Sequence, residues 1–323
     1  MSIKKIDLGT LNEWVEGLIG KQKIIGPQAS GHRFNFGPLT KAADLRLDYD
    51  VTILPPKSFL QPPKETVLTF RMDAGYESTI DSEPFVLFGV HPYDMIAMAQ
   101  MDEIFSEGNC DTHYMTRREN ATVVVVDVQK VSPDVFAGYM GTSHVEDGYD
   151  VLLTKIGDDY IVDAKTDKGE ALMGGLADTP DASESWLEQR RLVWDYNKQR
   201  LRKHELITEP SRWPELLEDA YDHPLWEERA KLCFSCGSCN LVCPTCYCFD
   251  VSDEVNWDLQ SGERVRVWDG CMLSEFATVA GNINFRKDRA ERYRHRYYRK
   301  GKYVPPKIGG QIACVGCGRC ITA

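Results

Sequence analysis

The segment CFSCGSCNLVCP, residues 233–244, decides how this chain is organised. It places Cys233, Cys236, Cys239 and Cys243 in a C-x2-C-x2-C-x3-C-P pattern. This spacing is typical of iron–sulfur proteins, because the repeated two-residue step lets successive thiolates surround one corner of a cubane cluster. Zinc sites usually pair two separated short cysteine units, so the triple step favours iron–sulfur over zinc.

A second run, CVGCGRC at residues 314–320, repeats the first three steps with Cys314, Cys317 and Cys320. In two-cluster ferredoxins the fourth cysteine of each run ligates the cluster of the other run. Cys243 would therefore complete the cluster of the second run. The cluster of the first run needs a cysteine beyond Ala323, so we expect either that the polypeptide continues or that another cysteine supplies this thiolate.

The remaining cysteines are also crowded towards the C-terminal end. Of the 11 cysteines in the chain, only Cys110 precedes Cys233. Such clustering in a chain without an export signal indicates metal binding and not a disulfide framework. Three cysteines lie outside both runs: Cys246, Cys248 and Cys271. They are additional ligands of a cluster or of a further centre, redox-active thiols, or buried small apolar side chains.

Composition and charge exclude several classes of protein. The chain has 323 residues, enough for about two domains. Hydrophobic residues make up 42% and charged residues 27%, which are ordinary globular values. No apolar run is long enough for a membrane helix, and the N-terminus lacks the apolar core of a signal peptide. We therefore expect a cytoplasmic protein without membrane insertion, and a net charge of −11 argues against a chain that coats nucleic acid.

The hydrophobic pattern predicts an α+β fold with two parts. Residues 1–205 are predicted to form a mixed α/β docking domain. Residues 206–323 are predicted to form an α-helical, ferredoxin-like dicluster domain with a long insertion between the two cysteine runs. Helices in that insertion are expected to carry the motif Trp268-Asp-Gly-Cys271. In the N-terminal part we expect helices over 11–18, 95–105 and from 183 to about 203, strands over 66–70, 85–90 and 122–128, and a hairpin over 150–154 and 160–163.

The segment RKDRAERYRHRYYRKGK, residues 286–302, carries nine lysines and arginines interleaved with aromatic residues. Such a basic helix can dock an acidic partner, and nearby cations can offset the negative charge of iron–sulfur clusters. Basic residues with aromatics also occur in nucleic-acid-binding proteins, but the sequence holds no other nucleic-acid motif, so this interpretation is disfavoured. The predicted docking residues are Arg286, Arg289, Arg292, Arg294 and Arg296.

These motifs together resemble one family. Besides both cysteine runs, the likeness includes GERVRVWDGC at 262–271, FATVAG at 276–281 and the basic segment, with weaker matches at GVHPYD 89–94, YMTRRE 114–119 and GYDVLLT 148–154. The chain resembles the 4Fe-4S dicluster subunits typified by the iron–sulfur subunit of anaerobic sulfite reductase and by the beta subunit of cytoplasmic sulfhydrogenase-type NiFe hydrogenases. The likeness covers most of the chain, and its C-terminal motifs are the more specific.

The resemblance implies an electron-transfer iron–sulfur subunit of an anaerobic, cytoplasmic, multi-subunit oxidoreductase. Such a protein relays electrons through two 4Fe-4S clusters between a diaphorase-type subunit, which binds flavin and NAD(P), and a catalytic subunit of the NiFe hydrogenase or sirohaem reductase type. It would have no catalytic residues of its own. Whether the chain is itself an enzyme stays open, since the alternative is a thiol or noncubane-cluster redox enzyme that uses Cys246, Cys248 and Cys271.

One departure from the family is visible in the N-terminal part. Many relatives carry cysteines at the place of Tyr93, near Val128, and as Cys-Phe-Cys where this chain has Val135-Phe136-Ala137. Cys110 alone cannot replace that set. The difference suggests that the N-terminal part serves mainly as a docking scaffold.

Overall fold

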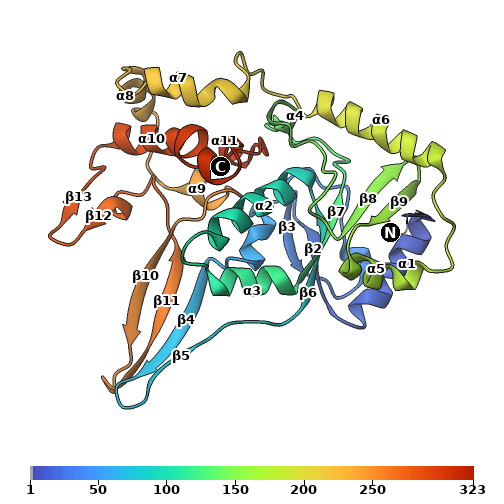
Figure 1. The fold of residues 1–323 in the computed structure, drawn as a ribbon, viewed down its shortest axis with the longest axis horizontal. Coiled ribbons are helices and arrows are strands. Elements are labelled where there is room, and N and C mark those ends of the chain that lie inside the picture. The colour runs from blue at the N-terminus through green and yellow to red at the C-terminus, as the bar shows by residue number, and fades with distance from the viewer. Residues whose placement is uncertain (1–2) are drawn as a thin grey trace.

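The computed structural model describes residues 3–323, and over these residues the N-terminal part is built on a seven-stranded mixed sheet (Figure 1). The strand order is β1-β9-β8-β7-β6-β2-β3. The neighbours β2, β6, β7 and β8 run parallel, whereas β1, β9 and β3 pair antiparallel at the two edges. The bounds are β1 Ile3–Asp7, β2 Lys23–Ser30, β3 Arg33–Pro38, β6 Phe85–Val90, β7 Ala121–Val126, β8 Val151–Ile156 and β9 Asp159–Ala164.

Helices cover both faces of this sheet, which explains why its central strands are almost wholly apolar. On one face lie α1 (Leu8–Ile19) and α5 (Asp167–Leu172), packed on a core that includes Trp14 and Phe88. On the other face lie α2 (Pro92–Ser106) and α3 (Thr112–Asn120). The Asp7 side chain caps α1 by accepting a hydrogen bond from the Thr10 backbone N–H at 2.7 Å.

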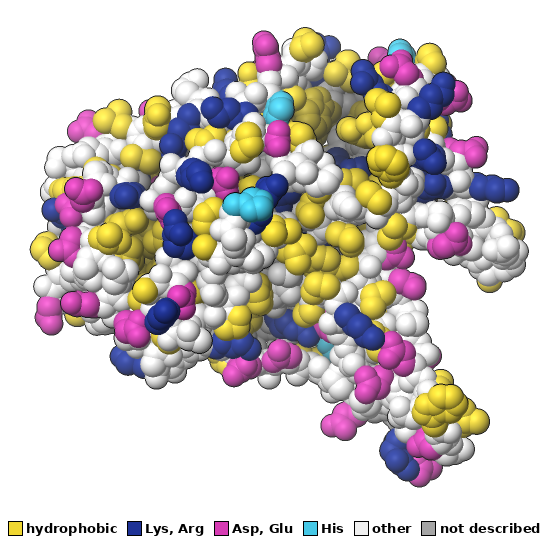
Figure 2. All heavy atoms as spheres, turned by 180° about the vertical axis from the view of Figure 1, so that it is seen from behind, with side chains coloured by type: hydrophobic (Ala, Val, Ile, Leu, Met, Phe, Trp, Pro, Cys, Tyr) yellow, Lys and Arg dark blue, Asp and Glu magenta, His cyan; other side chains and the backbone are white. Residues whose placement is uncertain are grey.

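A second sheet combines strands from both ends of the chain. Its order is β10 (Phe249–Val255), β11 (Ser261–Trp268), β4 (Lys64–Arg71) and β5 (Gly75–Ser78), all antiparallel. It extends from the body as an arm, at the lower left of Figure 1, and the same arm projects at the lower right of the opposite view in Figure 2. The expectation that helices carry the Trp268–Cys271 motif is wrong, because the motif follows directly from β11. The alternation Arg264-Val265-Arg266-Val267 is a strand pattern, which explains the difference.

Short helices make up most of the rest, gathered at the top of Figure 1. The aromatic rings of Trp226 and Tyr298 join α8 to α10, with centroids 5.9 Å apart. Helix α10 carries the basic segment and begins with a capping box between Asp288 and Glu291. The bounds are α4 Ala137–Met140, α6 Glu184–Arg200, α7 Trp213–Asp219, α8 Leu225–Ala230, α9 Ser238–Leu241, β12 Thr278–Val279, β13 Ile283–Asn284, α10 Arg289–Tyr298 and α11 Arg319–Thr322.

The α+β fold class is confirmed, and so are the predicted N-terminal elements. The strand expected over 85–90 is β6, and the hairpin over 150–154 and 160–163 is β8 with β9. The helices expected over 11–18, over 95–105 and after Ser183 are α1, α2 and α6. Within residues 3–323, none of the helices has the length and apolar character needed to cross a membrane.

Candidate metal centre

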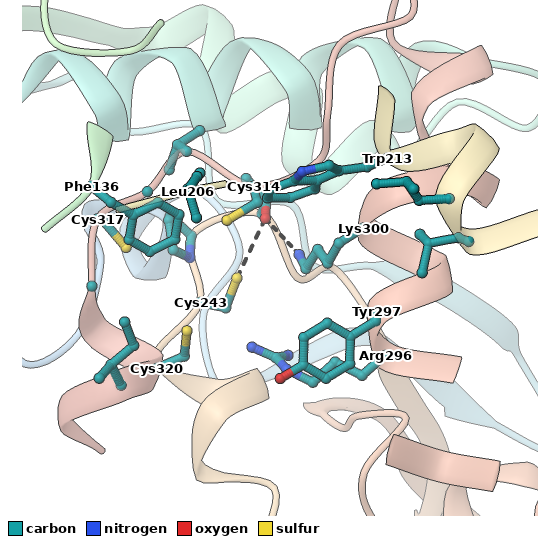
Figure 3. A pocket seen from close by; sticks show the side chains of 18 residues that line it. Phe136, Leu206, Trp213, Cys243, Arg296, Tyr297, Lys300, Cys314, Cys317 and Cys320 are labelled. Atoms are coloured by element: carbon teal, nitrogen blue, oxygen red, sulfur yellow. Dashed lines mark hydrogen bonds between the residues drawn. The ribbon is translucent and has the colours of Figure 1, made fainter. Parts of the chain in front are cut away.

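Cysteines from both runs line one cavity of about 470 Å3. Cys243 of the first run faces Cys314, Cys317 and Cys320 of the second run across it (Figure 3). This is the ligand set that the crossed arrangement of two-cluster ferredoxins requires for one cluster. The sequence separates Cys243 from Cys314 by the whole β10–β11 hairpin and α10, so the fold, and not local spacing, brings them together.

The rest of the wall is mostly apolar and comes from distant parts of the chain. Phe136 belongs to the N-terminal part, Leu206 and Trp213 follow α6, and Ile321 lies on α11. An apolar wall of this kind excludes water from a bound cluster, and burial is one of the factors that set cluster potential.

Two cations of α10 and the turn after it face the sulfurs. Lys300 donates to Thr245 Oγ1 at 2.5 Å, and this hydroxyl is 3.3 Å from Cys243 Sγ. A hydrogen bond from Cys246, helped by Lys300 and Arg296, holds the pKa of the Cys243 thiol well below its usual range. Burial lowers the pKa of Lys300, but Cys243 and Cys246 outweigh it and raise that pKa above its ordinary value. These groups therefore favour the anionic form of Cys243, which is the form that binds iron.

The second run is fastened to the N-terminal part through its backbone. The Phe136 backbone N–H donates to the Gly316 carbonyl at 2.8 Å, and Thr142 Oγ1 donates to the Val315 carbonyl at 2.7 Å. Gly316 and Gly318 both have positive φ, +66° and +82°. A Cβ on Gly316 would lie 2.7 Å from the backbone N of Ala137, so this contact requires glycine.

Arg319, a residue of the second run, forms a buried ion pair with the N-terminal part. Arg319 donates to both carboxylate oxygens of Asp94 on α2, at 2.6 and 2.7 Å. It also donates to the carbonyl and the hydroxyl of Thr52, at 2.9 and 3.0 Å. Both charged side chains are buried, with Arg319 3% and Asp94 0% exposed. The pKa of the neighbouring Cys317 thiol is raised to about 12, chiefly by burial, while Arg319 opposes the shift.

Many relatives carry cysteines at certain positions of the N-terminal part. In this chain, these positions lie together where the N-terminal part contacts the second run. Tyr93, Val128, Val135 and Ala137 form one hydrophobic cluster with Val315 and Cys317. In this chain, these positions therefore provide apolar packing against the second run. The role of the N-terminal part as a docking scaffold stays a prediction.

The start of the first run, around Cys233 and Cys236, lies at the surface, whereas its last cysteine, Cys243, is buried. Cys236 is exposed, and Phe234 beside it is 91% exposed. Its backbone turns through positive φ at Ser235 and Gly237, at the same places as Gly316 and Gly318 in the second run. Helix α9, which holds Cys239, packs against α11. Burial raises the pKa of the Cys239 thiol, and Cys320, Cys243 and Cys271 contribute, so these thiols are neighbours.

The three additional cysteines gather beside Asn240. The Asn240 Nδ2 atom lies 3.6 Å from Cys246 Sγ and 3.5 Å from Cys271 Sγ. Cys248 lines the same small cavity. Their grouping was not predictable from spacing, because Cys271 lies beyond a hairpin from the other two. The exposed Cys110 lies far away in the sequence, before α3.

The five arginines predicted to dock a partner have different surroundings. Arg289 is exposed, and Arg286 and Arg294 are half-buried. Arg292 is buried and donates to the Arg286 and Lys287 carbonyl oxygens, and Arg296 faces the cysteine cavity. Docking stays a prediction, with Arg289 the most accessible of the five.

Across residues 3–323, no three His, Cys, Asp or Glu side chains lie close enough together to hold a single metal ion. A cubane holds its four thiolates on separate corners, so its ligands are spaced more widely than those of one ion. The donor set, the apolar wall and the facing cations fit a cluster. Sequence reasoning missed the Asp94–Arg319 pair, since nothing in the local sequence marks either residue.

Comparison with known proteins agrees with this geometry. The profile of the 4Fe-4S dicluster domain family matches residues 232–323, which contain all seven cysteines of the two runs. The chain is 32% identical over 303 residues to sulfhydrogenase 2 subunit beta of Pyrococcus furiosus, covering 92% of this chain and 87% of that protein. No solved structure matches the chain. The chain therefore belongs to the family of sulfhydrogenase beta subunits and is an iron–sulfur electron-transfer protein.

Proposed function

We propose that this chain holds two 4Fe-4S clusters and passes electrons within a multi-subunit cytoplasmic oxidoreductase. Cys314, Cys317, Cys320 and Cys243 hold one cluster. Cys233, Cys236 and Cys239 hold the other, with a fourth ligand still to be identified. The observation that carries the proposal is the single cavity lined by Cys243 together with the three cysteines of the second run. Crossed ligation of this kind is the signature of paired clusters.

When bound, the clusters supply one-electron transfer. The residues of the chain hold them, exclude water and set the local charge. Phe136, Leu206 and Trp213 wall the inner site with apolar side chains, and Lys300 and Arg296 face its sulfurs. The N-terminal part holds the second run in place through Gly316 and Arg319.

The partners in this proposal follow from the family of the chain. The beta subunit of a sulfhydrogenase belongs by name to a larger enzyme. We place a diaphorase-type subunit with flavin and NAD(P) on one side and a catalytic metal subunit, of the NiFe hydrogenase or sirohaem reductase type, on the other. The exposed first run, with Phe234 at its surface, is the site where a partner can approach a cluster most closely. The thiolate ligands fit an anaerobic, reducing cytoplasm.

Anaerobic iron and sulfide analysis with EPR of the dithionite-reduced full-length chain tests the proposal. About eight irons in two interacting clusters are expected at a minimum. Cys243→Ser should remove the cluster of the second run and leave that of the first. Zinc in place of iron, or loss of the first-run cluster in that variant, would overturn the assignment. Co-purification of the natural complex then identifies the partner subunits.

A further inference from the structure

Cys246, Cys248 and Cys271 are used by neither proposed ligand set, yet they lie in one place. The start of β10 and the end of β11 are paired, Phe249 with Trp268, and the Asp269 backbone N–H donates to the Cys248 carbonyl at 3.1 Å. This pairing closes the base of the arm. It places Cys271, which follows β11, beside the two cysteines that precede β10.

The sulfurs at this site accept hydrogen bonds. The side-chain amide of Asn240 lies within 3.6 Å of two of them, Cys246 Sγ and Cys271 Sγ. The Arg296 guanidinium lies 3.8 Å from Cys246 Sγ. Asn240 is itself fixed, because its Oδ1 accepts from the Met272 backbone N–H at 3.2 Å. Donors held in this way around sulfur are typical of iron–sulfur sites, where they orient and tune the ligands.

Over residues 3–323, the side chains around these three cysteines include several cations but no carboxylates that pair with them. Lys57 is only 2% exposed, and its ammonium contacts the Cys246 carbonyl oxygen and the Trp268 ring, 4.4 Å away. Arg299 donates to the Tyr247 hydroxyl and lines the same cavity. Among the described residues, no Asp or Glu forms an ion pair with Lys57 or with Arg299. A buried cation such as Lys57 without a counter-ion is costly, so an anionic group is expected beside it.

Inert buried thiols do not explain this arrangement. Neutral cysteines buried for packing behave as small apolar side chains, and apolar neighbours suit them best. Here an amide, two arginines and two lysines surround the three thiols. These donors and cations would stabilise the negative charge of a centre bound by the three sulfurs.

We infer that Cys246, Cys248 and Cys271 are the ligands of a third iron–sulfur centre, which lies beside Asn240 and adjoins the relay cluster through the contact between Cys246 and Cys243. Soft thiolate ligands select iron–sulfur clusters, copper(I) or zinc. In the part of the chain that the structure describes, no three such side chains are grouped tightly enough to hold one ion, whereas a multinuclear centre binds its thiolates on separate corners. The space between these side chains is about 20 Å3, so the long side chains of Arg299 and Lys300 in its wall would have to shift to admit the centre while their charges stay beside it.

The test is metal and sulfide analysis of the full-length chain and of the triple variant Cys246→Ser, Cys248→Ser, Cys271→Ser. The parent should contain more than the eight or so irons of two cubanes, and the variant should lose about one fifth to one third of its iron with matching sulfide. EPR of the two relay clusters should persist. Cys110→Ser, which changes an exposed cysteine elsewhere, is the control and should lose none.

Each other outcome contradicts the inference in a different way. Unchanged iron in the triple variant, with the relay clusters intact, would overturn the third centre and leave the proposed function standing. Loss of the first-run cluster from Cys271→Ser alone would make Cys271 the missing fourth ligand instead. Zinc lost in place of iron would overturn the iron assignment. A parent without any iron would overturn the proposed function itself.

A second variant keeps the test decisive if the triple variant does not fold. Lys57→Met removes the buried cation and keeps the apolar stem. With a negatively charged centre beside it, the variant should release iron to a chelator several-fold faster than the parent. Without such a centre, the same change removes an uncompensated charge, so iron release would be unchanged and the protein would become more stable.

Discussion

The first cysteine run turns through left-handed backbone at Ser235 and Gly237, and the second run turns in the same way at Gly316 and Gly318. Their surroundings differ. The second run is enclosed by the N-terminal part, with backbone of 134–137 against both glycines. The start of the first run lies at the surface, where Leu232 and Phe234 are 76% and 91% exposed.

The comparison shows which backbone features the cysteine motif itself requires and which are required by the residues packed around it. Both runs need the left-handed turns, because both must bring three thiols to one place. Only the second run needs glycine at its first turn, since a side chain there would meet the backbone of Ala137. We infer that the two runs have different roles. The second run is anchored to the N-terminal part and shielded from solvent, and the first run is accessible to a partner.

The largest effect is expected at the ion pair that anchors the second run. Asp94→Asn leaves the Arg319 guanidinium buried without its carboxylate, and breaking a buried pair in this way costs about 3–5 kcal/mol. Denaturant unfolding of the variant measures the loss. The control is Asp253→Asn, which breaks an exposed pair with Arg264 on the arm and should cost at most about 1 kcal/mol. Equal losses would contradict the anchoring role of Asp94.

A reciprocal exchange at the first turn of each run is expected to have the next largest effect. Gly316→Ser places a side chain in left-handed backbone against Ala137 and should destabilise the protein by about 3 kcal/mol. Ser235→Gly removes a strained serine and one contact with Arg292, so stability should change by no more than about 1 kcal/mol. Thermal unfolding of both variants tests the comparison. If the serine were tolerated at 316, the enclosure of the second run would not be as tight as the structure indicates.

A smaller effect is expected from pH, through His91 behind the second run. His91 is fully buried and stacks on Tyr49, with ring centroids 3.9 Å apart. Burial, helped by Arg319 and Arg200, holds its pKa well below the usual value. Since the unfolded chain takes up this proton near pH 6.5 and the folded chain does not, the stability from neutral His91 is complete above that pH. It is lost as the pH falls, by about 1.4 kcal/mol per unit.

Unfolding measured at pH 7.5, 6.5 and 5.5 in the parent and in His91→Gln tests this dependence. The variant should show a shallower loss of stability on acidification, because it has no imidazole to protonate. The same slope in both proteins would show that other groups carry the acid sensitivity.

The sequence predicted which cysteines of the two runs meet at the inner cavity, and their role as cluster ligands stays a proposal, but it did not predict their surroundings. The cysteine spacing predicted the crossed set of Cys243 with the second run, because ligation rules act on local spacing. The arm was missed because its strands pair β4 with β11 across 190 residues or more, and such contacts leave no local signal. The alternation at 264–267 is a local strand pattern that the prediction of a helical insertion did not take into account. Asp94 was hidden because its partner, Arg319, lies in the last helix.

The smallest effect on stability, and the most direct test of the open role of the first run, is expected from Phe234→Ala. This side chain is almost fully exposed, so the variant should unfold within about 0.5 kcal/mol of the parent. An exposed aromatic beside a cluster ligand is a typical contact residue of a protein interface. In the natural complex, electron transfer between subunits should therefore fall several-fold, with the iron content unchanged. Normal transfer in this variant, measured with the same assay that detects the loss in Cys236→Ser, would move the partner contact away from the first run.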